Sequence, residues 1–256
     1  MMVNIYRPQP PLSDFVDLFW LEEIRDAARG KERVLPTRTI TLVLDLGSRA
    51  SIVSGAHSQF FVLDTTQPSS FLGVHFKPGG AFPFFQVPLG ELQNAVVSLD
   101  ALWGASVDDL RDQLLAVGTP DRQFRALQKV LLDQAAHPLV QHPAITFALA
   151  EFERPTHAQR IRDVTEHIGL SKRQFTHLFA EAVGLTPKEF CRVRRFQAVL
   201  RRIERQPSLD WVDLALTCGY YDQAHFIHEF RTLSGFTPTT YLLERGERLN
   251  HVALRD

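Results

Sequence analysis

The sequence contains few cysteines, and it lacks the patterns that mark zinc sites, signal peptides and membrane spans. Its 256 residues include only two cysteines, Cys191 and Cys218, which lie far apart within helical patterns. Such cysteines fit buried, reduced thiols, and no Cys or His spacing resembles a zinc site, so no metal is expected. The N-terminal residues lack the pattern of a signal peptide, and no apolar run is long enough to span a membrane. We therefore expect a cytoplasmic protein that does not associate with membranes.

Patterns on which catalysis depends are also missing from the sequence. There is no glycine-rich phosphate loop, no nucleophile elbow and no metal-binding pair of histidines. A metal-binding cupin would need clustered His and Glu, whereas the β-rich region offers only His57 and His75, widely separated. Each of these is more simply a hydrogen-bonded or exposed histidine than a ligand. We predict that the protein is not an enzyme and uses no cofactor.

The net charge of −1 conceals a strong asymmetry along the chain. Residues 1–153 carry 12 basic and 17 acidic side chains, and residues 206–256 carry 4 and 7. Residues 154–205 carry 12 basic and only 5 acidic side chains, a local balance of +7. Positive charge concentrated in one segment suits contacts with phosphates.

The first part of the chain reads as strands followed by helices. Alternation and short apolar runs predict four strands: Thr39–Leu44, Ser51–Ser54, Phe60–Leu63 and Phe71–Phe76. After a turn at residues 77–80, helical periodicity covers Val107–Val117 and Pro120–Gln134, with Ser106 and Thr119 as the expected N-caps.

Residues 137–143, with two prolines that resist helix formation, form the predicted linker between domains. The expected division is a first domain at 1–136, the linker at 137–143, a helical domain at 144–245 and a tail at 246–256. Capping boxes at Thr156–Gln159, Ser171–Gln174 and Thr186–Glu189 mark helix starts in the helical domain.

The helical domain contains a repeat with a period of 51 residues. Phe175–Phe179 precedes Gly184-Leu185-Thr186-Pro187, and Phe226–Phe230 precedes Gly235-Phe236-Thr237-Pro238. Each copy follows a short helix that ends in glycine, Gly169 or Gly219. Two helix-turn-helix units in one chain suit the reading of two successive major grooves of double-stranded DNA.

In each copy the helix that begins after Ser171 or Asp222 is the expected recognition helix. Its aromatic residues must pack inwards, and its remaining side chains can offer donors, acceptors and small apolar groups to base edges. The candidate contacts in the two helices are Ser171, Lys172, Arg173, Thr176 and His177, then Gln223, Ala224, His225, Ile227 and His228.

A helix of about 28 Å over Pro187–Arg205 is predicted to join the two units. Its arginines include Arg195, a further candidate DNA contact. Without the repeat, these polar faces would read as the solvated surface of a helical bundle. The alternative function is accordingly a non-catalytic scaffold whose helices bind protein without specific DNA binding.

Residues 144–245 resemble the DNA-binding domain of AraC/XylS-type transcriptional regulators. The resemblance is strongest from Gly219 to Arg231 and through Gly235-Phe236-Thr237-Pro238 to Tyr241. It implies seven helices, two helix-turn-helix units with a linking helix, and a sequence-specific regulator. The family often has Arg where this chain has His177 and His228, and the second unit is net acidic, so we expect the first unit to dominate affinity.

The family usually pairs this domain with an N-terminal sensing or dimerising domain. Residues 1–136 resemble a β-rich, cupin-related sensor, so the expected fold class is α+β. One hypothesis is an effector pocket among Phe60, Phe61, Phe71 and Phe76; the other is a homodimerisation or protein-contact module in which these aromatics are core. RNA polymerase is a further partner that such a regulator would contact.

Overall fold

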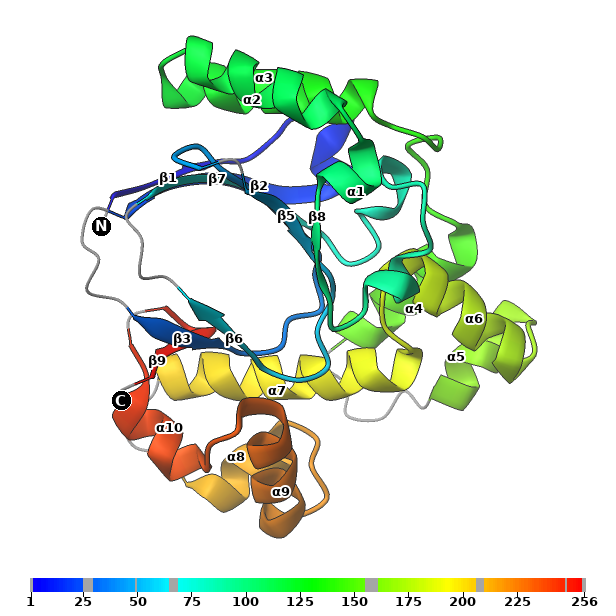
Figure 1. Cartoon of the computed structure of the whole chain (residues 1–256). Helices are drawn as coiled ribbons and strands as arrows, with labels where there is room; N and C mark the ends of the chain where they lie inside the picture. The colour runs from blue at the N-terminus through cyan, green and yellow to red at the C-terminus, as the bar shows by residue number, and fades with distance from the viewer. Residues whose placement is uncertain are drawn as a thin grey trace.

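The structure is a computed structural model that describes residues 2–24, 30–48, 50–64, 69–154, 161–205, 210–246 and 248–254. These residues form two parts: a curved, β-rich part and a helical part built on one long helix (Figure 1). The predicted α+β class is confirmed. The capping box expected at Thr156–Gln159 lies outside the described residues.

An antiparallel sheet dominates the β-rich part, with the strand order β1-β2-β7-β4-β5-β8 among the described residues. The prediction of Ser51–Ser54 is confirmed without a shift, and the other three predicted strands are confirmed with one or both ends shifted by one or two residues. The sequence analysis missed three strands of this sheet. The strands are β1 (Met2–Tyr6), β2 (Val16–Ile24), β4 (Thr41–Asp45), β5 (Ser51–Ser54), β7 (Ser69–Phe76) and β8 (Val96–Ser98).

The two faces of this sheet have different surroundings. Leu72, Val74 and Phe76 of β7 are fully buried in the core formed with α2 (Ser106–Ala116) and α3 (Pro120–Asp133), which cover the outer face (Figure 1). The alternate residues of β7 point to the opposite, inner face. There Trp20 lies over Gly73, where a Cβ atom would come within 2.2 Å of the indole ring. Glycine at 73 therefore lets the Trp20 ring lie flat on the inner face.

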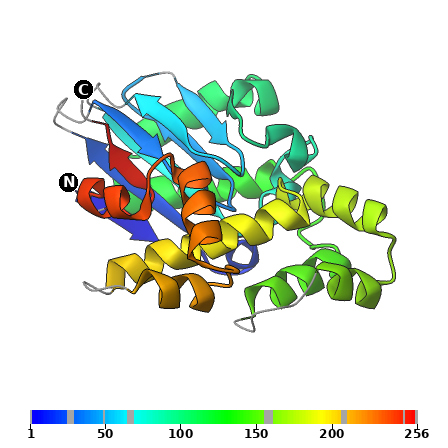
Figure 2. The same cartoon turned by 90° about the horizontal axis from the view of Figure 1, so that it is seen from below.

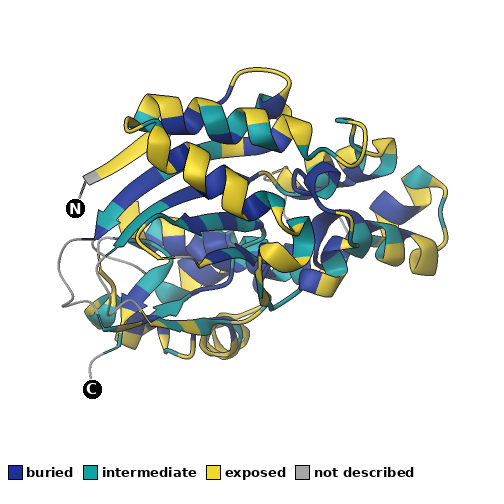
Figure 3. Ribbon diagram, turned by 45° about the horizontal axis from the view of Figure 1, so that its top comes forward, coloured by how far each residue is buried: buried dark blue, intermediate teal, exposed yellow. Residues whose placement is uncertain are grey.

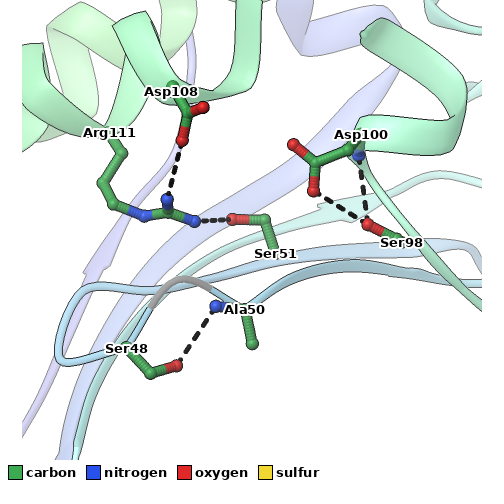
Figure 4. A network of polar contacts seen from close by, with 7 residues as sticks. All are labelled: Ser48, Ala50, Ser51, Ser98, Asp100, Asp108 and Arg111. Carbon is green, nitrogen blue, oxygen red and sulfur yellow. Dashed lines mark hydrogen bonds and ion pairs between the residues drawn. The ribbon is translucent and has the colours of Figure 1, made fainter. Parts of the chain in front are cut away.

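A buried arginine joins α2 to the sheet. The guanidinium of Arg111 donates to Ser51 Oγ of β5 at 2.9 Å and lies 3.3 Å from Asp108 Oδ1 of its own helix (Figure 4). The preceding short helix, α1 (Asp100–Trp103), begins where Ser98 Oγ accepts from the Asp100 amide and donates to its carboxylate.

The expected N-cap at Ser106 is wrong. Ala105 occupies the cap position, and the Ser106 hydroxyl donates to the Trp103 carbonyl at 2.8 Å because the short helix just before leaves that carbonyl available. Thr119 does stand at the N-cap of α3, but its side chain makes no capping hydrogen bond there.

A smaller sheet faces the inner side of the larger one. Its strands are β6 (Phe61–Asp64), β3 (Lys31–Val34) and β9 (His251–Ala253), in that order. β9 comes from the segment expected to be a tail, and it pairs with β3 from the first part of the chain. The last described residues are therefore part of the N-terminal architecture.

The helical part contains seven described helices, the number that the resemblance implies. Their bounds are α4 (Pro143–Glu153), α5 (Ile161–Ile168), α6 (Lys172–Val183), α7 (Pro187–Arg205), α8 (Trp211–Thr217), α9 (Gln223–Ser234) and α10 (Pro238–Glu244). The first unit lies at the Pro187 end of α7, and the second unit packs against the rest of α7 (Figure 2).

Two hydrophobic cores hold the described residues together. The first runs without a break from Leu12 in the β-rich part to Phe175, Phe179 and Phe190 in the first helix-turn-helix unit. The second core contains residues of α7, α8, α9 and α10, together with Leu35, which follows β3, and Val252 of β9. The predicted domain boundary at residues 137–143 stays a prediction. The first hydrophobic core contains residues from both sides of this segment.

His57 gives the fold a predictable dependence on pH. Burial lowers the pKa of His57 to about 4, and its Nε2 lies 3.0 Å from Ser54 Oγ. The unfolded chain therefore binds a proton more readily than the folded chain between pH 6.5 and 4, and stability falls as the pH drops through this window. We expect a loss of about 3 kcal/mol from this group.

Urea unfolding of the wild type and of His57→Gln at pH 7 and pH 4 measures this effect. The variant should show a smaller loss between the two pH values, because Gln does not titrate. An equal pH dependence of the two proteins would remove His57 as its source.

Candidate nucleic-acid interface

The first helix-turn-helix unit consists of α5, a turn at Gly169 and α6. Gly169 adopts a positive φ of 75°, which glycine tolerates without strain. Ser171 and Gln174 form the predicted capping box: Ser171 Oγ accepts from the Gln174 amide, and Gln174 Oε1 accepts from the Ser171 amide. The start of α6 is therefore fixed at the residue that the sequence predicts.

The two halves of α6 have different environments. Ser171, Lys172, Arg173 and His177 are exposed, and Thr176 is half-buried. The second half packs against the β-rich part at η4 (Leu89–Leu92), where a Cβ atom on Gly90 would lie 3.2 Å from the Ala180 carbonyl. The first two turns of α6 are therefore the part of the helix that is open to DNA.

The second unit repeats this arrangement with α8 and α9. The Asp222 side chain accepts from the His225 amide at 2.7 Å and caps α9, as predicted. Phe226 and Phe230 are fully buried. The predicted contact residues of α9 are all exposed: Gln223, Ala224, His225, Ile227 and His228.

Tyr221 is a candidate contact that the sequence analysis missed. It stands directly before the N-cap of α9, and its side chain is 86% exposed. The neighbouring Tyr220 is buried against Phe226. The sequence offered one signal for this contact: Tyr221 is an aromatic residue next to the expected N-cap, and the core does not require it.

An ion pair sets the position of α9 on α7. Arg192 Nε donates to Glu229 Oε2 at 2.6 Å, and both side chains are largely shielded from solvent. We expect Arg192→Gln to lower the free energy of unfolding by about 1–2 kcal/mol, because Glu229 would keep its charge without its partner.

Urea unfolding compared with Arg205→Gln, an exposed position on the same helix, isolates this effect. Equal stability of the two variants would show that the pair contributes nothing measurable.

Arg195 is only half-buried but has a partner inside the protein. Its guanidinium lies 5.6 Å from the centre of the Tyr220 ring, and its Nε is buried without a hydrogen bond. Burial raises the pKa of Tyr220, so this tyrosine stays neutral. The geometry gives Arg195 a packing role between α7 and α8–α9, and its contact with DNA remains a prediction.

The four aromatics proposed for an effector pocket do not share one space. Phe76 packs against Phe84 and Phe85 in the outer core, with a ring-centre distance of 5.5 Å to Phe84. Phe60 stacks on the guanidinium of Arg33, which belongs to the contact with the second unit. Phe61 stacks on His57, and Phe71 is half-buried on the inner face of β7.

The inner face of the larger sheet, which faces the smaller sheet, carries other residues. Trp20, Phe71 and His75 line the larger sheet, and His75 Nδ1 lies 3.0 Å from Thr41 Oγ1. The indole Nε1 of Trp20 is buried without a hydrogen bond. This inner face carries half-buried aromatic rings and polar groups side by side.

Arg248 connects the two sheets across this space. It lies 3.6 Å from Glu22 of β2 and binds Glu32 of β3, which also contacts His251 at 3.0 Å. Burial alone would raise the pKa of Glu32, but the hydrogen bonds and charges of His251 and Arg248 outweigh it and hold the pKa below its usual value. The carboxylate therefore stays ionised and keeps β9 attached.

The described residues contain no cluster of three or more His, Cys, Asp or Glu side chains suited to a metal ion. No helix within the described ranges has the length and apolarity needed to cross a membrane.

Residues 4–98 match a domain of unknown function (DUF6597), and residues 164–244 match a helix-turn-helix domain. An uncharacterised HTH-type transcriptional regulator of Haemophilus influenzae is 26% identical over 117 residues, 45% of this chain and 39% of that protein. The HTH-type transcriptional regulator ArgR of Pseudomonas aeruginosa is 26% identical over 101 residues, 38% of this chain and 30% of that protein. The matches thus span two-fifths or less of these curated relatives.

A structure of ToxT from Vibrio cholerae aligns over 94% of this chain and 97% of its own, with 12% identity and a TM-score of 0.44. Three observations agree on the helical part: residues 164–244 match a helix-turn-helix domain, α7 joins two capped repeats, and both relatives are named HTH-type transcriptional regulators. The C-terminal part of the chain therefore carries a helix-turn-helix domain of the AraC type, like the domains of HTH-type transcriptional regulators.

Proposed function

We propose that the protein controls transcription in the cytoplasm by placing α6 and α9 in two successive major grooves of one DNA site. The observation that carries this proposal is the division of each helix into two sides. The predicted contacts on the first turns are exposed or half-buried, while Phe175, Phe179, Phe226 and Phe230 are fully buried. Figure 3 shows buried and exposed residues alternating along the helices of the molecule. Both helices therefore offer a fixed polar surface at the end that HTH proteins insert into DNA.

The two helices would contribute unequally to binding. α6 begins with Lys172 and Arg173, which can contact phosphates and guanine, and it belongs to the basic segment 154–205. α9 offers His225 and His228 beside acidic Asp222. A neutral imidazole donates one hydrogen bond, whereas a guanidinium can donate two to one guanine. The first unit would therefore supply most of the affinity.

Selection of binding sites from random duplex DNA with the purified protein tests this function. We expect an enriched site with two motifs about one helical turn apart. The affinity for that site should fall steeply between low and high salt, because phosphate contacts release counterions. A scaffold that binds only protein would enrich no sequence and show no steep salt dependence.

The N-terminal half would bind a small apolar or amphipathic effector between its two sheets. Trp20 and Phe71 are half-buried on the inner face of the larger sheet, and the indole Nε1 of Trp20 is buried without a hydrogen bond. The ion pair between Arg248 and Glu22 adds charge beside these rings. An effector in this space would touch β9, which follows the second unit in the chain, and so alter DNA affinity or contact with RNA polymerase.

A dimerisation module is the competing role for this half. Leu115 of α2 and Leu132 of α3 are 51% and 41% exposed on the outer helices. Thermal unfolding separates the roles. A ligand of the inner space raises the melting temperature at constant protein concentration, whereas a homodimer gives a melting temperature that rises with protein concentration.

A further inference from the structure

A cavity of about 390 Å³ lies outside the space between the sheets. Four parts of the chain form it: the turn and 3-10 helix after β7, the predicted linker, the start of α4, and the second half of the recognition helix α6. The residues that line it are Gly79, Phe82, Pro83, His137, Pro138, Val140, Gln141, His142, Pro143, Ile145, Leu178, Glu181 and Ala182. Its volume is within the range of small-molecule sites.

Aromatic and proline rings form much of the wall of this linker cavity. Phe82 stacks on His137 with ring centres 5.0 Å apart and planes inclined by only 10°. Pro83, Pro138 and Pro143 add rings of fixed backbone geometry. The linker is also held to the β-rich part by the amides of residues 136 and 137, which donate to the Pro83 carbonyl. Parallel rings and proline faces suit a planar aromatic guest.

The charge in the cavity comes from Glu181 of α6. Among the described residues, its carboxylate has no hydrogen-bond or ion-pair partner. His142 Nδ1 accepts from the Ala144 amide at 3.1 Å, so in the neutral ring Nε2 carries the proton. A half-buried carboxylate without a partner favours a cation, since the free protein offers it no compensating charge.

We propose that the linker cavity binds a small planar aromatic ring that carries an alkylammonium group, with the ring between Phe82 and the prolines and the ammonium group on Glu181. Such a ligand would touch the β-rich part, the linker and α6 at once. Glu181 lies one helical turn after His177 on α6, so the bound amine would sit next to the surface offered to DNA. Occupancy would therefore change the affinity for DNA, by about 5- to 100-fold for ordinary coupling between two sites.

Calorimetric titration of the full chain with tryptamine, without DNA, tests the site directly. We expect saturable one-to-one binding, weakened about tenfold or more in Glu181→Gln, because the neutral amide removes the charge-assisted contact. Val140→Lys, at a position that is 73% exposed, should weaken binding by repulsion without disturbing the core. The uncharged 3-methylindole should bind much more weakly than tryptamine to the wild type. Circular dichroism checks that each variant is folded.

Glu166→Gln is the matched control, because Glu166 is an exposed carboxylate on the neighbouring α5. It should bind tryptamine as the wild type does. No saturable binding, or equal affinity of the Glu181→Gln variant, would overturn the site. Because no DNA is present, this result is independent of the proposed DNA-binding function. Repeating DNA titrations with saturating tryptamine then tests the coupling, which an unchanged DNA affinity would overturn.

Discussion

Phe179→Ala is expected to lower the free energy of unfolding by about 3–5 kcal/mol. Phe179 is fully buried, and its ring meets Phe152 of α4, Phe175 of α6 and Phe190 of α7 at centre distances of 5.4–5.7 Å. Removing the ring leaves a cavity where three helices meet. Because this core continues into the β-rich part, the loss should appear in one transition that includes the strands.

Urea unfolding followed by circular dichroism and by tryptophan fluorescence measures this loss. Leu178→Ala, a half-buried neighbour on the same helix, is the control and should cost markedly less. A separate early transition of the helical signal alone would contradict the continuous core, because it would show that the first unit unfolds independently of the β-rich part.

Arg173→Ala should weaken binding to the selected DNA site by about 1–3 kcal/mol, which is roughly 5- to 150-fold. Arg173 is exposed on the first turn of α6 and far from the buried side of the helix, so the substitution should leave the fold intact. His228→Ala at the equivalent surface of α9 should cost less, because a neutral imidazole makes a single hydrogen bond.

Fluorescence anisotropy with the selected duplex and with a scrambled duplex distinguishes base contacts from phosphate contacts. A base contact by Arg173 predicts a loss confined to the selected duplex, whereas a phosphate contact predicts equal losses on both. Arg125→Ala, at an exposed position of α3 away from the interface, serves as the control. An unchanged affinity of Arg173→Ala for the selected duplex would remove this residue from the interface.

Local signals made the helical part predictable from the sequence. The capping boxes at Ser171 and Thr186 each form both reciprocal hydrogen bonds, and α7 has the predicted bounds Pro187–Arg205. Asp222 caps α9 as expected. These features depend on residues three or four positions apart, and side-chain chemistry alone determines them.

Long-range pairing explains what the sequence could not predict. β2 contains Asp17, Glu22 and Glu23, which obscure the alternation of a strand that lies between β1 and β7. β9 has only three residues and exists because β3 offers an edge to it. Neither strand carries a turn or cap signal that would mark it locally.

The candidate pocket residues show the same limit. Phe71 and Phe76 lie in one predicted strand, but their odd spacing places them on opposite faces of β7. Trp20 and Arg248, which line the inner space, are 228 positions apart and share no local pattern. The predicted DNA contacts are defined by local pattern instead, because each set lies on one face of one helix, and they stay predictions.

Hydroxyl-radical footprinting of the protein on its selected DNA site tests the central claim most directly. If α6 and α9 occupy successive major grooves, the footprint has two protected segments about one helical turn apart on the same face of the duplex. Arg173→Ala should weaken the protection at one segment, and His228→Ala at the other. A single protected segment, or protection that both variants weaken at the same segment, would contradict bipartite reading by the two helix-turn-helix units.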